Sequence, residues 1–224
     1  MRYKWLNQNK NKKIILFFNG WGMDECIVKH LDCEDYDVLM FYDYNTLDTD
    51  FDFSILNSYS EKNLVAWSMG VMIVWYLTNF IHHLNNFSHQ EKRVCINGTL
   101  SPIDVQFGIH PKIYDLTING FNEKGRERFI SSMFNDKQEI ICSRTLENQH
   151  SELIALKELS TTSSYIQLLP STRNEGKTFY NKIIISDNDR IIPTKSQVAF
   201  WKIEPNLKEG HCPFFRFKKW SELL

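Results

Sequence analysis

The chain of 224 residues carries 26 basic and 27 acidic side chains, a formal net charge of −1, and is 42% hydrophobic. This length fits one globular domain, and the balanced charge provides no overall field to attract nucleic acid or a membrane surface. The five cysteines are odd in number and lack a CxxC pair, which favours reduced thiols over a disulfide framework. The first apolar run is too short for a signal sequence or a membrane span, so we expect a cytoplasmic protein, with a monomer favoured.

Strand patterns recur along most of the chain. An edge strand is expected at 2–6, followed by a polar turn over residues 7–13. Continuous β-branched and aromatic runs, typical of strands covered on both faces, follow at 14–18, 37–41, 63–67, 93–96 and 182–185. The long connections between these runs predict a mainly parallel sheet with crossover helices, an α/β fold.

Helical patterns come in three groups. The segment 69–80 is apolar almost all round, which predicts an interior helix. Two amphipathic patterns, 126–134 and 152–159, interrupt the parallel rhythm, and we expect an insertion after the sixth strand, about 100–178, to form a helical cap over the site. A last helix is predicted at 214–224. The chain is therefore expected to be one domain, 1–224, with a cap insertion.

The sequence Ala66-Trp67-Ser68-Met69-Gly70 stands where a predicted strand meets the interior helix. A serine at a sharp strand-to-helix turn is lifted out of the sheet, with the next backbone amide aimed at the same space. The small residues Ala66 and Gly70 allow strand and helix to close around it. The motif alone is common, but its position predicts that Ser68 is the nucleophile of a serine hydrolase.

Partners for this serine follow in the order acid, then base. His211 is the histidine that follows the last predicted strand, in a tight loop between Gly210 and Pro213, and we expect it to be the base. The alternative is a purely structural role, as a surface loop histidine that caps the last helix. Two acids follow the strand 182–185, and turns favour Asp for purely local reasons; we favour Asp189 as the triad acid, with Asp187 as the alternative.

The loop 19–24, with glycines on both sides of Trp21, is expected to supply the amide of Trp21 to an oxyanion hole. The strand-to-helix turn at Ser68, called the elbow below, is expected to supply the amide of Met69. A glycine-rich hairpin with a packed tryptophan is the alternative. The sequence has no phosphate-binding glycine motif and no acids and histidines at metal-ligand spacing, so neither a cofactor nor a metal is expected. Cys212 beside His211 suggests a thiol mechanism, which we consider the weaker alternative.

These stretches together resemble a known family, the BioG-type pimeloyl-acyl-carrier-protein methyl ester esterases of the α/β-hydrolase superfamily. The resemblance lies in Phe17 to Asp24, Ala66 to Val71, Asn97-Gly98-Thr99 with Pro102, and Gly210 to Phe214, and it extends almost end to end. It implies hydrolysis of the methyl ester of pimeloyl-acyl-carrier protein in biotin biosynthesis. It also implies that Ser68, Asp189 and His211 are the triad and that Trp21 and Met69 form the oxyanion hole.

Specificity for such a substrate must come from the acyl and carrier side, because methanol is small. We expect an apolar channel lined by Trp21, Trp67 and the cap residues Phe129 and Met133. An acidic carrier protein would be met by Lys124, Arg126 and Arg128, although these could equally form a solvated helix face. The alternative functions are a general short-chain carboxylesterase or thioesterase, and a non-catalytic binding module with the hydrolase fold.

Overall fold

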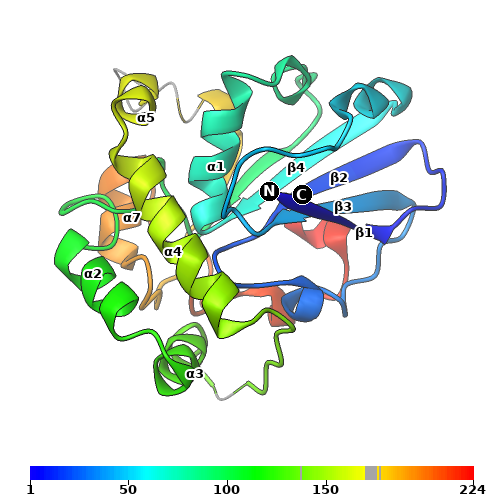
Figure 1. The fold of residues 1–224 in the computed structure, drawn as a ribbon. Coiled ribbons are helices and arrows are strands. Elements are labelled where there is room, and N and C mark those ends of the chain that lie inside the picture. The colour runs from blue at the N-terminus through cyan, green and yellow to red at the C-terminus, as the bar shows by residue number, and fades with distance from the viewer. Residues whose placement is uncertain (137, 170–175, 177) are drawn as a thin grey trace.

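A six-stranded sheet forms the centre of the molecule, in the order β1-β3-β2-β4-β5-β6 (Figure 1). The computed structural model describes residues 1–136, 138–169, 176 and 178–224. The strands are β1 (Arg2–Asn7), β2 (Lys13–Phe18), β3 (Tyr36–Tyr42), β4 (Glu61–Trp67), β5 (Arg93–Ile96) and β6 (Lys182–Ile184). The edge strand β1 is antiparallel to β3, and the other pairs are parallel. The predicted mainly parallel α/β sheet is confirmed.

The parallel strands are buried on both faces, which explains their continuous apolar sequences. Side chains of β2 alternate between two clusters: Ile14, Leu16 and Phe18 face one core, while Ile15 and Phe17 face the other. Because parallel strands all end at the same edge, the loops after β2, β4, β5 and β6 come together there. The residues predicted as nucleophile, acid, base and oxyanion amides all belong to this edge.

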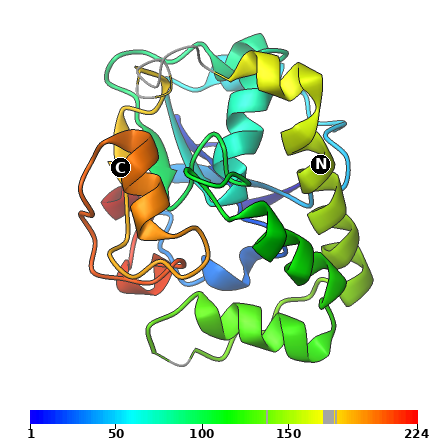
Figure 2. The ribbon, with the colours of Figure 1, turned by 90° about the vertical axis from the view of Figure 1, so that its left-hand side faces the viewer.

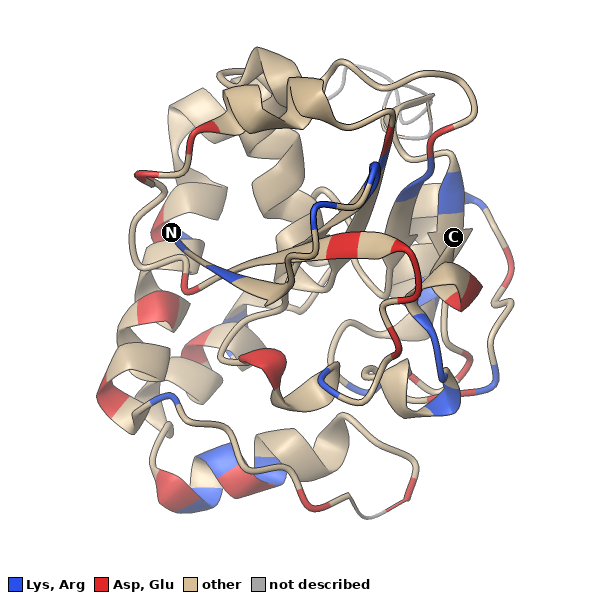
Figure 3. Cartoon of the chain, turned by 90° about the vertical axis from the view of Figure 1, so that its right-hand side faces the viewer, with Lys and Arg blue, Asp and Glu red and all other residues tan. Residues whose placement is uncertain are grey.

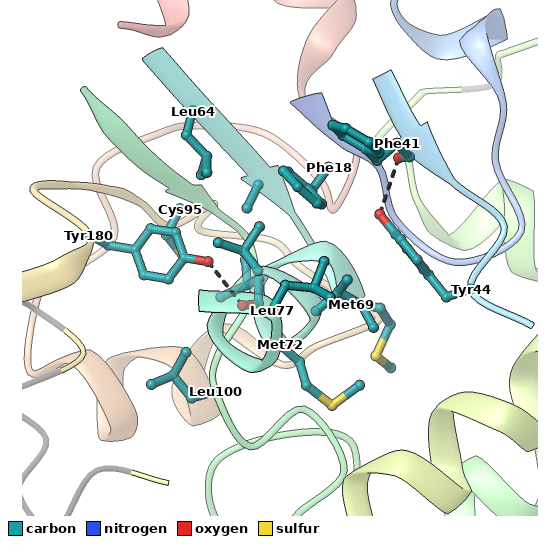
Figure 4. Close-up of a cluster of buried hydrophobic side chains, with 14 of the residues drawn as sticks. Phe18, Phe41, Tyr44, Leu64, Met69, Met72, Leu77, Cys95, Leu100 and Tyr180 are labelled. Atoms are coloured by element: carbon teal, nitrogen blue, oxygen red, sulfur yellow. Dashed lines mark hydrogen bonds between the residues drawn. The ribbon is translucent and has the colours of Figure 1, made fainter. Parts of the chain in front are cut away.

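Helix α1 (Met69–Thr78) packs on the face of Ile14 and Leu16 and is interior, as predicted. In Figure 4, Met69, Met72 and Leu77 of this helix lie among the side chains of Phe18, Leu64 and Cys95, which come from the sheet. Two tyrosine hydroxyls buried in this core are hydrogen-bonded to backbone carbonyls: Tyr180 donates to Val71 O at 2.9 Å, and Tyr44 donates to Phe41 O at 3.2 Å. The same face also receives α7 (Thr194–Trp201).

The segment between β5 and β6 contains the helices α2 (Pro111–Asn119), α3 (Glu123–Ser132), α4 (Leu146–Thr161) and α5 (Ser163–Leu168). Figures 1 and 2 show α2, α3 and α4 grouped beyond the edge where β4 leads into α1. The insertion therefore precedes the sixth strand of this chain, which corrects the expected position after it. The helices α3 and α4 are longer at their N-terminal ends than predicted, because Asn122 and Thr145 cap them. Residues 137, 170–175 and 177 of the expected cap lie outside the described residues.

The predicted helix over 214–224 is wrong. The chain forms two short 3₁₀ segments instead, Phe214–Arg216 and Trp220–Leu223, separated by Phe217 in an extended conformation. The rings of Phe214 and Trp220 both pack on Phe17, at 5.5 and 5.2 Å between centroids. Six residues of α-helix turn through about 600°, so one straight helix would direct these two side chains about 120° apart. Burying both on the second face of the sheet therefore breaks the helix.

Candidate active site

Ser68 lies at the turn between β4 and α1, with φ 56° and ψ −122°. This is a backbone conformation that a non-glycine residue rarely adopts, at a cost of roughly 1–3 kcal/mol. The turn is tight because Gly70 packs directly on the end of β2: a Cβ at Gly70 would lie 2.3 Å from Phe18 O. A Cβ at Gly20 would lie 2.7 Å from the Trp67 ring and 3.1 Å from Ser68 Cβ. The two glycines therefore allow the elbow to form.

A chain of hydrogen bonds joins the three residues expected from the sequence as nucleophile, base and acid. His211 Nε2 lies 2.8 Å from Ser68 Oγ, and His211 Nδ1 lies 2.7 Å from Asp189 Oδ2. The carboxylate can only accept, so Nδ1 carries the proton and Nε2 is free to accept from the serine hydroxyl. The side chains of His211 and Asp189 are 1% and 0% exposed, which strengthens their interaction.

Of the two acids in the turn after β6, Asp189 makes the contact with His211. Its Oδ1 accepts from the amides of Ile191 and Ile192, at 2.8 and 3.0 Å. Its Oδ2 accepts from Gln197 Nε2 at 2.8 Å in addition to His211. Asp187 is exposed, and its amide is hydrogen-bonded to Leu207 O. Four donors around one carboxylate hold it in one orientation.

Two backbone amides at the end of the sheet are available for a developing negative charge. Among the described residues, neither Trp21 N nor Met69 N has a hydrogen-bond acceptor. Met69 follows Ser68 at the first turn of α1, where helical amides have no partner within the helix. The loop of Trp21 is shaped by Asn19, whose Oδ1 accepts from Gly20 N at 2.8 Å and whose Nδ2 donates to Asp24 O at 3.0 Å. An oxyanion hole requires two amides that are free in this way.

An apolar pocket of about 300 Å³ opens beside this loop, between α2, α3 and the turn after β6. Its walls include Phe121, Phe129 and Ile191. The indole of Trp21 contacts the rings of Phe121 and Phe129 at 5.2 and 4.5 Å between centroids, and so connects these walls with the loop after β2. Phe129 therefore lines a pocket that the indole of Trp21 joins to the loop after β2, and its contact with a substrate stays a prediction.

The structure places Trp67 and Met133 differently from the expected channel wall. Both are buried in the core on the second face of the sheet, with 1% and 0% exposure. Trp67 donates through Nε1 to His211 O at 2.8 Å, and Met133 O accepts from Cys212 N at 3.0 Å. Because successive strand residues point to opposite faces, Trp67 turns away from the face where α1 packs. These two residues support the histidine loop.

A family model described as pimeloyl-ACP methyl esterase BioG matches residues 1–223 of this chain. The chain belongs to the BioG family. The crystal structure of BioG from Haemophilus influenzae superposes with a TM-score of 0.82, at 29% identity, covering 100% of this chain and 99% of that one. An esterase from Exiguobacterium antarcticum shares the fold, with a TM-score of 0.54 at 15% identity over 96% of this chain and 89% of that one. The α/β-hydrolase fold is confirmed, and the BioG family places the chain among carboxylic ester hydrolases.

The BioG chain also resembles part of a longer protein. A Bacteroides fragilis protein named malonyl-[acyl-carrier protein] O-methyltransferase is 36% identical over 197 residues, which cover 85% of this chain and 37% of that protein. A Haemophilus influenzae protein is 30% identical over 223 residues, covering 96% of this chain and 95% of that one. The chain thus spans little more than a third of the first relative and nearly all of the second.

Two buried residues that sequence reasoning missed hold the loop of His211 and the turn of Asp189 in place. Asn97, at the end of β5, donates to His211 O at 2.9 Å and to Ser186 Oγ at 2.8 Å, and its Oδ1 accepts from Ser186 N at 2.8 Å. Asn97 thus joins the loop of His211 to the turn that begins at Ser186 and contains Asp189. Gln197 of α7 contacts the acid directly. Asn97, with φ 46°, carried a weak signal, since Asn tolerates this conformation at a strand end; Gln197 carried none.

Other potentially reactive side chains at this end of the molecule are held in structural roles. Burial raises the pKa of the Cys212 thiol, which keeps it protonated and disfavours a thiol mechanism. Within the described part of the chain, Asp24, Cys26 and Cys142 are the trio whose donor atoms are grouped as for a metal, within 4.8 Å of one another. The Asp24 oxygens already accept from Cys26 N and from Ser143 N and Oγ. These bonds join the loop after β2 to the segment before α4.

Charges on the insertion are mixed. Figure 3 shows basic and acidic positions next to each other on α3, which carries Lys124, Arg126 and Arg128 together with Glu123 and Glu127. Arg128 is exposed at the pocket between α2 and α3. Arg190, which was not singled out from the sequence, lines the same pocket. No described helix is both long enough and apolar enough to cross a membrane.

Proposed function

We propose that this BioG-family chain removes the methyl group from pimeloyl-acyl-carrier-protein methyl ester, as a cytoplasmic step of biotin biosynthesis, with Ser68, His211 and Asp189 as its catalytic triad. The observation that carries the proposal is the continuous relay from Ser68 Oγ through His211 to Asp189, with distances of 2.8 and 2.7 Å. It starts at a strained turn, and the amides of Trp21 and Met69 have no acceptor within the described part of the chain. Acyl transfer through serine uses all of these parts together.

In the first half of the reaction, Ser68 Oγ attacks the ester carbonyl while His211 Nε2 takes the hydroxyl proton. The negative charge that develops on the carbonyl oxygen is stabilised by the amides of Trp21 and Met69. His211 then gives its proton to the leaving methoxide, methanol departs, and the acyl group remains on Ser68. In the second half, His211 takes a proton from water as the water attacks the acyl carbonyl. His211 then returns this proton to Ser68 Oγ as the acyl–serine bond breaks, and the product leaves with its free carboxylate.

Asp189 acts through His211. During each half-reaction the imidazole becomes positively charged, and the buried carboxylate 2.7 Å away stabilises that charge. Because Asp189 is itself held by Ile191, Ile192 and Gln197, the imidazole keeps the tautomer that leaves Nε2 free for the serine proton. The triad is thus preorganised for proton transfer.

The pocket between α2 and α3 is proposed to bind the acyl chain and the arm that joins it to the carrier protein. Phe121, Phe129 and Ile191 offer apolar contacts, and Arg128 and Arg190 stand at the same pocket as cations that fit a phosphate or an acidic carrier surface. The insertion, about 100–178, is proposed to be the cap of a single domain. The name of the Bacteroides relative, which methylates a carrier-bound acid, fits a chain that removes a methyl ester from such a substrate.

The experiment compares the wild type with Ser68→Ala and with Ser164→Ala, an exposed serine on α5 that serves as the matched control. Loss of the methyl group from pimeloyl-acyl-carrier-protein methyl ester is followed by mass spectrometry. Ser68→Ala should lower kcat by about 10⁴-fold or more while leaving the fold intact, and Ser164→Ala should change nothing. Near-full activity of Ser68→Ala would remove the proposed mechanism.

Two further measurements separate the alternative functions. Similar kcat/KM for the carrier-bound ester and for free short-chain esters or thioesters would indicate a general esterase or thioesterase. A fluorophosphonate probe should label the wild type at Ser68, and a folded wild type that is not labelled would instead be a binding module. Restoration of biotin-independent growth in a strain without its own methyl ester esterase would support the pathway assignment.

A further inference from the structure

Helix α4 is joined to the loop of Trp21 by three buried hydrogen bonds. Trp21 Nε1 donates to Gln149 O at 2.8 Å, Gln149 Nε2 donates to Gly22 O at 2.7 Å, and Gly22 N donates to Glu152 Oε2 at 2.9 Å. Gln149 and Glu152 are three residues apart, so they lie on one face of the helix. The two sides of this contact are separated by more than a hundred residues of sequence.

Glu152 is fully buried, and its charge is satisfied on all sides. Its Oε1 accepts from Tyr44 N at 2.7 Å, and Arg144 Nη1 donates to its Oε2 at 2.6 Å. The Arg144 side chain is 3% exposed and also pairs with Asp43 at 3.2 Å. Burial raises the pKa of Glu152, and the ion pair with Arg144 and the two amide donors oppose that rise. A buried carboxylate with this many donors has a fixed position.

The same carboxylate also holds the loop indirectly. Tyr44, whose amide Glu152 accepts, donates its hydroxyl to Asn19 O at 2.9 Å. Glu152 therefore acts on the loop from Gly22 on one side of Trp21 and, through Tyr44, from Asn19 on the other. Gly22 has φ +75°, a conformation that residues with a Cβ rarely adopt. In this conformation both its N–H and its C=O are hydrogen-bonded to side chains of α4. The only amide between these two anchors without an acceptor among the described residues is that of Trp21.

We propose that Glu152, assisted by Gln149, is a positioning residue that holds the Trp21 amide in the orientation the oxyanion requires, so that the helical insertion builds part of the catalytic machinery. The inference rests on the proposed function, since it assigns the Trp21 amide to an oxyanion hole. It predicts that loosening these contacts weakens binding of the charged transition state and leaves ground-state binding nearly unchanged.

Glu152→Gln is the sharpest perturbation, because it keeps the shape of the side chain. A carboxamide has one oxygen and one NH₂ group, so it cannot accept from both Gly22 N and Tyr44 N. One of these amides then faces a donor, and the loop must shift. Gln149→Met removes the bond to Gly22 O without burying a new polar group, and Gln149 Oε1 has no partner to lose. This second variant is expected to fold even if Glu152→Gln does not.

Glu91→Gln is the matched control. Glu91 is 5% exposed and, like Glu152, accepts from two backbone amides, those of Lys62 and Ser88. It lies at the opposite edge of the sheet, where β4 begins. The loss of thermal stability in this variant shows what the same chemical change does away from the site.

The wild type and the three variants are compared in kcat and KM for p-nitrophenyl butyrate. They are also compared in affinity for two inhibitors: a trifluoromethyl ketone, which forms an oxyanion on the serine, and the matching methyl ketone, which does not. Glu152→Gln should lower kcat and trifluoromethyl ketone affinity together by about 10- to 100-fold. KM and methyl ketone affinity should stay within about twofold. Gln149→Met should show the same pattern with a smaller change, and Glu91→Gln should keep the wild-type kcat.

The proposal is overturned if Glu152→Gln and Gln149→Met both keep kcat and trifluoromethyl ketone affinity near the wild-type values, or if Glu91→Gln loses kcat to the same degree. If Glu152→Gln does not fold, Gln149→Met alone decides the result. A failure of the proposed function is seen separately, because the wild type itself would then neither turn over the ester nor react with the trifluoromethyl ketone.

Discussion

Replacing Asp189 by asparagine changes the hydrogen bonds of the triad in a way that can be worked out from its neighbours. Two backbone amides, of Ile191 and Ile192, point at one side of this group and need an acceptor there. The asparagine oxygen must therefore take that side, and its NH₂ group faces Gln197 and His211. To avoid contacts between donors, Gln197 must turn its Oε1 toward this NH₂ group and His211 Nδ1 must become an acceptor. The imidazole proton then moves to Nε2.

That change of tautomer removes the base. Nε2 lies 2.8 Å from Ser68 Oγ, and once protonated it cannot take the serine proton. The positive charge on the imidazole also loses its buried counter-charge. The corresponding change in a serine protease triad lowers kcat by about 10⁴-fold, or roughly 5.5 kcal/mol in the activation free energy. KM should be nearly unchanged, because Asp189 contacts no substrate.

The assay is steady-state hydrolysis of p-nitrophenyl butyrate at neutral pH, with circular dichroism to show that each variant is folded. Asp187→Asn is the matched control, since Asp187 lies two residues earlier in the same turn and is exposed; it should keep wild-type kcat to within about threefold. The reasoning is refuted if Asp189→Asn keeps more than about a tenth of the wild-type kcat, or if Asp187→Asn shows the larger loss.

Two further predictions concern stability. Gly70→Ala would place a Cβ 2.3 Å from Phe18 O. Overpacking should lower the free energy of unfolding by about 1–3 kcal/mol, and the helix propensity of alanine should offset about 1 kcal/mol of this loss. Urea unfolding should therefore show a clear net loss of stability, which the control Gly120→Ala, at a helix end, should not show. Burial opposes ionisation of Asp24, but hydrogen bonds from Cys26 and Ser143 outweigh it and lower the carboxyl pKa from 3.8 to about 2. This stabilisation is present above pH 3.8 and is lost as the pH falls through 2, so the wild type should lose up to about 2 kcal/mol more than Asp24→Asn between pH 6 and pH 2.

Each of these has a contradicting outcome. A Gly70→Ala protein with the urea midpoint of the wild type would show that strand and helix can move apart at the elbow. Equal pH dependence of unfolding in wild type and Asp24→Asn would show that Asp24 does not carry the stabilisation assigned to it.

Local patterns explain why the fold was predictable. The apolar runs of β2 and β4 identify strands buried on both faces, and the apolar sequence after Ser68 identifies an interior helix, because side-chain periodicity depends only on neighbouring residues. The 3₁₀ segments at Phe214 and Trp220 were missed for the opposite reason. Their conformation is set by the need to bury two rings on Phe17, a contact with a residue two hundred positions earlier.

The candidate site divides in the same way. Ser68 could be singled out by a motif and His211 by its place after the last strand, since both depend on the order of elements in the chain. The sequence left Asp187 and Asp189 open, because an aspartate in a turn has the same local appearance whether it faces solvent or an imidazole. Trp67 was expected at the substrate and packs in the core, because adjacent positions on a strand face opposite sides.

The sequence by itself thus determined the strands of a mainly parallel sheet, the turn between strand and interior helix at Ser68, and the family to which the chain belongs. Only the tertiary structure decided that Asp189 meets His211, that Asn97 and Gln197 hold them, and that Glu152 of α4 reaches the loop of Trp21. Secondary structure is encoded over a few residues, whereas these contacts join segments that are brought together only when the layers of the fold pack.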